Sequence, residues 1–114
     1  MIEMRKEILY EKAIEEWGET AQIRVLQEEL CELSLSLHHL LRKNRKVTYH
    51  EIADETADVK IMLEQFNIIH PMSDLIANAK KKKLRKLAKY LNYDWEKPHV
   101  TKRWLKLKRQ NILK

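Results

Sequence analysis

Apolar side chains recur at steps of three and four residues along most of the chain, which is the spacing of amphipathic helices. The clearest series is Leu26, Leu30, Leu33, Leu37 and Leu40. The pattern predicts helices over residues 2–21, 22–41, 48–70 and 73–91, and a basic amphipathic helix within residues 100–113.

Local signals set several boundaries of these helices. Gly18 is the weak point of the first segment, and Pro71 ends the third because proline cannot continue a helix. Thr48 and Glu51 have the spacing of a capping box, in which each side chain binds a free backbone amide at the helix start. Ser73 is suited to cap the fourth helix.

The composition agrees with an all-α protein. With one Gly and two Pro in 114 residues, the chain lacks the turn residues of a β-protein, and its length suits one core. We expect an antiparallel helical bundle, with a helical domain over residues 1–92 and a basic amphipathic extension over residues 93–114. No stretch reaches the roughly twenty apolar residues of a membrane span, and no signal-peptide core is present, so we expect a cytoplasmic protein. The lone Cys31 is expected in the core.

The net charge of +6 conceals two halves of opposite sign. Residues 1–65 hold 14 acidic and 9 basic residues, a net charge of −5, whereas residues 66–114 hold 3 acidic and 14 basic residues, a net charge of +11. The total invites a nucleic-acid-binding hypothesis, but the asymmetry is what needs an explanation.

Two predicted helices carry acidic pairs beside their apolar faces. At about 100° per residue, Ile52, Val59 and Phe66 fall on the same side of their helix as Glu55, with Asp58 at the edge. Glu29 and Glu32 repeat this arrangement on the preceding helix. If the two helices pack together, four carboxylates converge, and such a cluster requires a cation.

Carboxylate oxygens select Mg²⁺, or Mn²⁺, over Zn²⁺. A di-iron centre needs a His three residues after a Glu on two helices, whereas Leu35 and Ile61 stand at those positions after Glu32 and Asp58. A zinc-protease motif beginning at His50 is excluded because its fifth residue is Asp54. The simplest alternative is that the acidic residues form a solvated face.

The fourth helix shows the opposite anomaly, since Lys83 lies within an apolar stripe and Lys80 lies near it. A lysine in such a place can extend its ammonium group to the rim. The functional alternative is a cation that holds a phosphate at the acidic cluster.

The acidic motifs read Glu28-Glu29-Leu30-Cys31-Glu32 and, after 22 residues, Glu55-Thr56-Ala57-Asp58. With Trp17-Gly18 and Gln22 ahead of the first motif, residues 10–91 resemble the MazG-like superfamily of all-α nucleoside triphosphate pyrophosphohydrolases, particularly its short stand-alone and phage-borne members. Leu87 departs from the family pattern, which often has Asn four residues after the lysine that Lys83 matches. Residues 93–114 lie outside the resemblance.

The resemblance implies a fold of this family's type and Mg²⁺-dependent cleavage of a nucleoside triphosphate to a monophosphate and pyrophosphate. Glu29, Glu32, Glu55 and Asp58 would be the catalytic metal ligands, and Glu28 would support them. Lys83, Lys80 and Arg85 would bind phosphates, and Trp17, Gln22 and Phe66 are candidates for contact with the base. Because long helices make a thin monomer, we expect a homodimer or homotetramer.

Two other classes of function stay open on the sequence. One is a small helical nucleic-acid-binding protein without enzymatic activity, which would use the lysines at 80–89 and the basic tail. The other is an adaptor whose C-terminal segment docks on a protein or an anionic membrane. The nucleic-acid-binding hypothesis does not explain the acidic residues beside the apolar faces.

Overall fold

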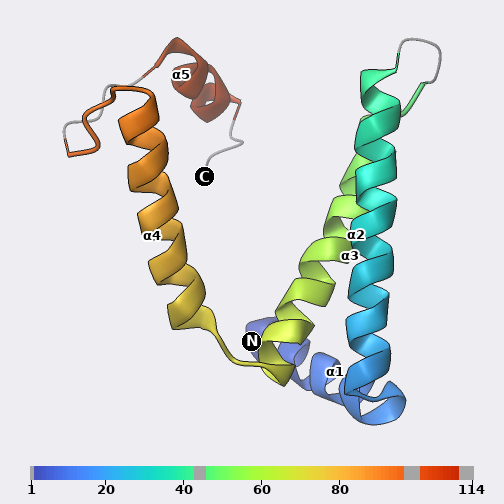
Figure 1. Cartoon of the computed structure of the whole chain (residues 1–114). Coiled ribbons are helices and arrows are strands. Elements are labelled where there is room, and N and C mark those ends of the chain that lie inside the picture. Colours follow the sequence, from blue (N-terminus) through green and yellow to red (C-terminus); the bar gives the residue numbers. More distant parts are fainter. Residues whose placement is uncertain (1, 43–45, 97–100, 111–114) are drawn as a thin grey trace. The chain divides into compact units, whose positions relative to one another are not determined.

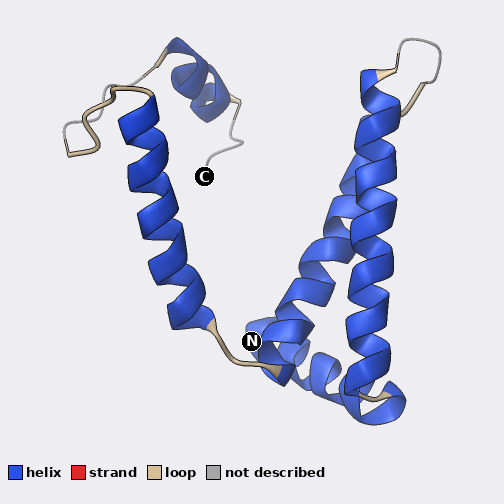
Figure 2. Ribbon diagram, in the orientation of Figure 1, coloured by secondary structure: helices blue, strands red, loops and turns tan. Residues whose placement is uncertain are grey.

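The computed structural model describes residues 2–42, 46–96 and 101–110, and these are all helix or loop. The helices are α1 (Ile2–Trp17), α2 (Glu19–Leu41), α3 (Tyr49–Ile69), α4 (Ser73–Tyr90) and α5 (Lys102–Arg109) (Figures 1 and 2). The prediction of an all-α fold is therefore confirmed. Val100 and Leu113, which belong to the predicted last helix, lie outside the described residues.

The chain divides into two compact units, Met1–Met72 and Ser73–Lys114. Residues 66–72 carry no charge, so the division coincides with the change of charge sign along the sequence. The first unit holds the net charge of −5 and the second the net charge of +11. The predicted boundary after residue 92 stays a prediction.

The first unit is built on α2 and α3, which run side by side in opposite directions, while α1 contacts both (Figure 1). Apolar side chains close its small core, and two glutamines are buried with them. The buried residues are Tyr10, Gln22, Leu26, Val59, Met62 and Gln65. The apolar stripes predicted for α2 and α3 thus meet each other, as their periodicity requires.

Gly18 is the boundary between α1 and α2, three residues earlier than the predicted boundary between residues 21 and 22. Its backbone has φ 90° and ψ 155°, a conformation that residues with a Cβ rarely adopt. Gly18 N–H still donates to Ile14 O at 2.8 Å, and Gly18 O accepts from Gln22 N–H at 3.2 Å. The chain therefore changes direction within one residue and keeps the backbone groups around it bonded.

The predicted capping box at the start of α3 is confirmed. Glu51 N–H donates to Thr48 Oγ1 at 3.1 Å, and Thr48 N–H donates to Glu51 Oε2 at 2.9 Å. At its other end α3 stops at Ile69, before Pro71, as predicted. Met72 N–H donates to Asn67 Oδ1 at 3.0 Å and ties the following loop to the helix.

In the second unit, α4 ends at Tyr90 and is followed by an asparagine in the left-handed conformation, Asn92 with φ 52°. Tyr93 N–H donates to Ala88 O at 2.9 Å and Asn92 N–H to Lys89 O at 3.1 Å, which is a Schellman motif. At the start of α5, Thr101 Oγ1 accepts from Trp104 N–H at 3.0 Å. None of the helices in the described part of the chain is both long and apolar enough to span a membrane.

The expectation that Cys31 belongs to the core is wrong, because its side chain is exposed. Cys31 lies about 200° around α2 from Glu29, which faces α3, so it points away from the contact between the two helices.

Candidate metal centre

Three carboxylates come together where α2 and α3 face each other. One carboxylate oxygen from each of Glu29, Glu32 and Glu55 lies within 4.8 Å of the other two. Oxygen ligands around a single Mg²⁺ ion, at about 2.1 Å from it, lie at most about 4.2 Å apart. Small side-chain rotations would therefore bring this acidic triad to the spacing that one hard cation needs.

Two members of the acidic triad hold oxygens that have no contact with water. Glu29 Oε2 and Glu55 Oε2 are buried and have no hydrogen-bond partner within the described part of the protein. The Glu29 and Glu55 side chains are half-buried as a whole, whereas Glu32 is exposed. A carboxylate oxygen loses hydration free energy when it is buried without a donor, so these two oxygens need either a proton or a cation.

The electrostatics of the triad lead to the same requirement. Burial, followed by the charges of Glu32, Asp58 and Glu55, raises the pKa of Glu29 above its ordinary value. Burial, followed by the adjacent Glu32 carboxyl, raises the pKa of Glu55. Each pKa rises because a further negative charge is costly in this place.

A buried hydrogen bond fixes the register between the two helices that carry the triad. Gln22 Nε2 on α2 donates to Gln65 Oε1 on α3 at 2.6 Å, and both side chains are about 95% buried. Glu29 follows Gln22 by seven residues on α2, and Asp58 precedes Gln65 by seven residues on α3. The carboxyl group of Asp58 lies beside that of Glu29. Two turns of helix therefore separate the glutamine pair from the acidic cluster on both sides.

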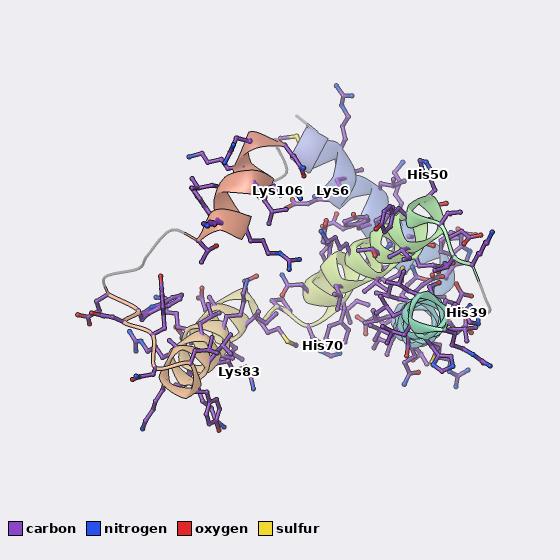
Figure 3. The ribbon with its side chains drawn as sticks, turned by 90° about the horizontal axis from the view of Figure 1, so that it is seen from above. Lys6, His39, His50, His70, Lys83 and Lys106 are labelled. Carbon is purple, nitrogen blue, oxygen red and sulfur yellow. The ribbon has the colours of Figure 1, made fainter. Side chains whose placement is uncertain are left out.

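The third helix of this unit is attached through Glu64 on α3. Lys6 Nζ lies 2.9 Å from Glu64 Oε2, and Tyr10 OH donates to the same oxygen at 3.1 Å. The hydrogen bonds from Lys6 and Tyr10 lower the pKa of Glu64 despite its partial burial. Because both donors lie on α1, this cluster fixes α1 against α3, and Figure 3 labels Lys6 on α1.

The structure gathers part of the predicted site. It brings Glu29, Glu32 and Glu55 together, with Asp58 next to Glu29 and Glu28 exposed on α2. The predicted phosphate-binding residues Lys80, Lys83 and Arg85 are exposed on α4, in the other unit, and their role stays a prediction.

The three candidates for base contact have different environments. Trp17 is 65% exposed at the end of α1 and lines a groove with Leu9 and Ile61. Gln22 is buried and bonded to Gln65, and Phe66 is half-buried with its ring centroid 5.5 Å from that of His70. Their role in base binding stays a prediction.

Sequence reasoning missed Gln65, Tyr10 and Glu64, which hold the helices that carry the site. The glutamine pair had a signal, because Gln22 lies on the apolar side of its helix. Nothing in the apolar periodicity indicated that the Tyr10 hydroxyl would meet Glu64.

Comparisons of this chain with protein-family models, with curated proteins and with solved structures found no match.

Proposed function

We propose that this protein is a Mg²⁺-dependent nucleoside triphosphate pyrophosphohydrolase that releases a nucleoside monophosphate and pyrophosphate. The observation that carries the proposal is the pair of buried, unpartnered oxygens, Glu29 Oε2 and Glu55 Oε2, within a triad of carboxylates. The type of reaction is inferred from the spacing of the two acidic motifs, which resembles that of the all-α pyrophosphohydrolases.

The donor set favours a hard cation. The triad consists of carboxylates alone, so Mg²⁺ fits it, and Mn²⁺ fits it as well. Glu29, Glu32 and Glu55 would hold the ion, with Asp58 as the fourth carboxylate beside Glu29. When bound, the ion would neutralise triphosphate oxygens and make a water molecule more acidic.

One carboxylate of the triad would also act as a base in this mechanism, and the two helices would hold the carboxylates in position. Glu29 or Glu32 would accept the proton of the attacking water, because each belongs to the cluster at which the triphosphate would be held. The packed helices α2 and α3 would keep the carboxylates in place during attack at the α-phosphate, so that little reorganisation is needed.

We further propose that the active form is a homodimer or homotetramer in the cytoplasm, where it removes unwanted nucleotides from the pool. Large apolar side chains of α2 support the assembly, since Leu30, Leu37 and Leu40 are 44–46% exposed in the single chain. An apolar face of this kind is stabilised when a second copy covers it.

The proposal is tested by measuring pyrophosphate release from each common ribonucleoside and deoxyribonucleoside triphosphate with and without Mg²⁺. Glu55→Gln keeps the size of the side chain and removes its charge. We expect this variant to lose at least about a hundredfold in kcat, because losing one element of transition-state stabilisation has costs of this order. Glu16→Gln, at an exposed position of α1, is the matched control and should behave as wild type.

A measurement without substrate separates binding of the ion from catalysis. Mg²⁺ should raise the Tm of the wild type and of Glu16→Gln, because a ligand that binds only the folded state stabilises it. It should raise the Tm of Glu55→Gln much less. Full activity of Glu55→Gln, or no pyrophosphate release by the wild type from any triphosphate, would refute the proposal.

A further inference from the structure

The second unit has a strongly one-sided charge, and the three predicted phosphate-binding residues account for only a small part of it. Residues 73–114 hold 14 basic and 3 acidic residues, and residues 75–93 include no Asp or Glu. All seven cations of α4, at positions 80–83, 85, 86 and 89, are exposed. A surface that only keeps a protein in solution mixes both signs of charge, so this one calls for an anionic partner.

Four of the seven cations of α4 share one side of the helix. At about 100° per residue, Lys81, Lys82, Arg85 and Lys89 fall within an arc of about 100° that contains no apolar residue. We call these four residues the basic arc. Lys81, Arg85 and Lys89 follow one another at four-residue steps, a rise of about 6 Å each. The basic arc is therefore a row of cations along one side of the helix.

No acidic residue lies within one helical turn of the basic arc along α4. No carboxylate stands three or four residues from Lys81, Lys82 or Lys89, whereas Arg85 lies four residues from both Lys81 and Lys89. Like charges at this spacing repel each other and destabilise a helix. A bound polyanion would remove this repulsion.

Exposed aromatic rings accompany the cations. Tyr90, Trp95 and Trp104 are 75%, 50% and 39% exposed. Lys86 Nζ lies 5.8 Å from the Tyr90 ring centroid, and Lys108 Nζ lies 5.0 Å from that of Trp104. α5 adds five cations and no acid, and Figure 3 labels Lys83 on α4 and Lys106 on α5. Cations combined with exposed rings are typical of surfaces that bind unpaired nucleic-acid strands.

We propose that the second unit binds single-stranded nucleic acid without sequence preference, with the basic arc on phosphates and Trp104 stacked on a base. An anionic membrane fits less well, because a helix that lies in a membrane surface needs an uncharged face. The apolar side of α4 is interrupted by Lys80, Lys83 and Lys86. This inference does not rest on the proposed hydrolysis, since the acidic triad lies in the first unit.

The test is fluorescence anisotropy of the full chain with labelled dT20 and rU20 over a series of salt concentrations. We expect equal binding of both strands, because phosphates and base faces are common to DNA and RNA. Lys81→Gln/Lys82→Gln/Lys89→Gln should make the slope of log K against log salt shallower by about 2, since each contact to a single strand contributes about 0.7. This triple variant leaves the predicted phosphate-binding residues Lys80, Lys83 and Arg85 in place.

The matched control is Lys12→Gln/Arg24→Gln/Lys60→Gln, which removes three exposed cations from the first unit and should leave the slope unchanged. Trp104→Ala should weaken binding about 5- to 150-fold, the range for loss of one stacked base, and Leu105→Ala should have little effect. Circular dichroism checks that every variant keeps its helices.

Three outcomes would overturn the inference. The first is no binding of either strand at low salt, and the second is a triple variant with the slope of its control. The third is sedimentation of the protein with phosphatidylserine vesicles but no binding to dT20 or rU20, which would identify a membrane surface as the partner. Glu55→Gln should bind both strands as wild type does, so loss of hydrolysis and loss of strand binding are separable.

Discussion

The buried glutamine pair gives the sharpest test of how this fold holds its acidic triad. Gln65→Met replaces the amide with an apolar side chain of similar length. Gln22 Nε2 would then be buried without its acceptor, which in the native protein is Gln65 Oε1 at 2.6 Å. Gln22→Met leaves the other half of the pair unpartnered. The double variant removes both polar groups and leaves two thioethers that fill the same space.

The expected magnitudes follow from the burial of the two side chains, which are 5% and 6% exposed. A buried polar group without a partner costs about 1–3 kcal/mol, so each single variant should lower the free energy of unfolding by that amount. In a domain of this size each kcal/mol corresponds to about 4–8 °C in Tm. The double variant should lie within about 1 kcal/mol of the wild type, because no polar group is then left unpartnered.

The assay is urea unfolding of the four proteins, followed by circular dichroism and analysed as a double-mutant cycle. We expect a coupling free energy of about 1–6 kcal/mol between the two positions, which is the summed cost of the single variants minus the small cost of the double variant. Leu26→Met, in the same interface but with no polar group, is the control for the introduction of methionine, and it should cost less than about 1.5 kcal/mol.

Additive effects would refute this reasoning. If the double variant loses as much stability as the two single variants together, within about 0.5 kcal/mol, the glutamines do not act as a pair. The register of α2 on α3 would then depend on apolar packing alone.

Three further changes test other parts of the first unit. Without metal, the raised pKa values of Glu29 and Glu55 mean that the folded state binds protons more tightly than the unfolded state, so the free energy of unfolding should rise as the pH falls from 7 to about 5. Urea unfolding at pH 5, 6 and 7 checks this, and a fall in stability would contradict it. Below about pH 4.3 the trend should reverse, because the lowered pKa of Glu64 reflects a stabilisation that is lost on protonation. Thr48→Ala removes the cap of α3 and should cost about 1 kcal/mol in chemical unfolding, and a cost near zero would mean that the capping box contributes nothing. Gly18→Ala should cost about 1–3 kcal/mol from backbone strain alone, since no atom lies within 4 Å of the added Cβ, and an unchanged Tm would show that the junction relaxes freely.

The helices were predictable because local signals in the sequence agree with their final positions. The apolar periodicity predicts α2 and α3. The Thr48–Glu51 pair predicts where α3 starts, and Pro71 predicts where it ends. The convergence of Glu29, Glu32 and Glu55 followed from two faces with the same offset from their apolar stripes.

Contacts between distant side chains were not predictable in the same way. Whether Gln22 would meet a substrate or another side chain depends on the rotation of α2 against α3. The apolar pattern of a single helix contains no information about this rotation. The exposure of Cys31 likewise depends on which sides of α2 other helices cover, and a series rich in leucine marks nearly every side as apolar. The bond from Tyr10 to Glu64 joins residues 54 positions apart and needs the bend at Gly18.

The seven-residue steps that link the glutamine pair to the acidic cluster make one kind of sequence change harmless and another harmful. The glutamine pair and the acidic triad lie within α2 and α3, outside the connection between Leu41 and Tyr49. A longer connection should therefore leave the carboxylates where they are. One residue inserted between Gln22 and Glu29 would turn every later side chain of α2 by about 100° and carry Glu29 away from Asp58. Natural variation in length therefore belongs in the connection, while the helical segments that hold the acids must keep their lengths.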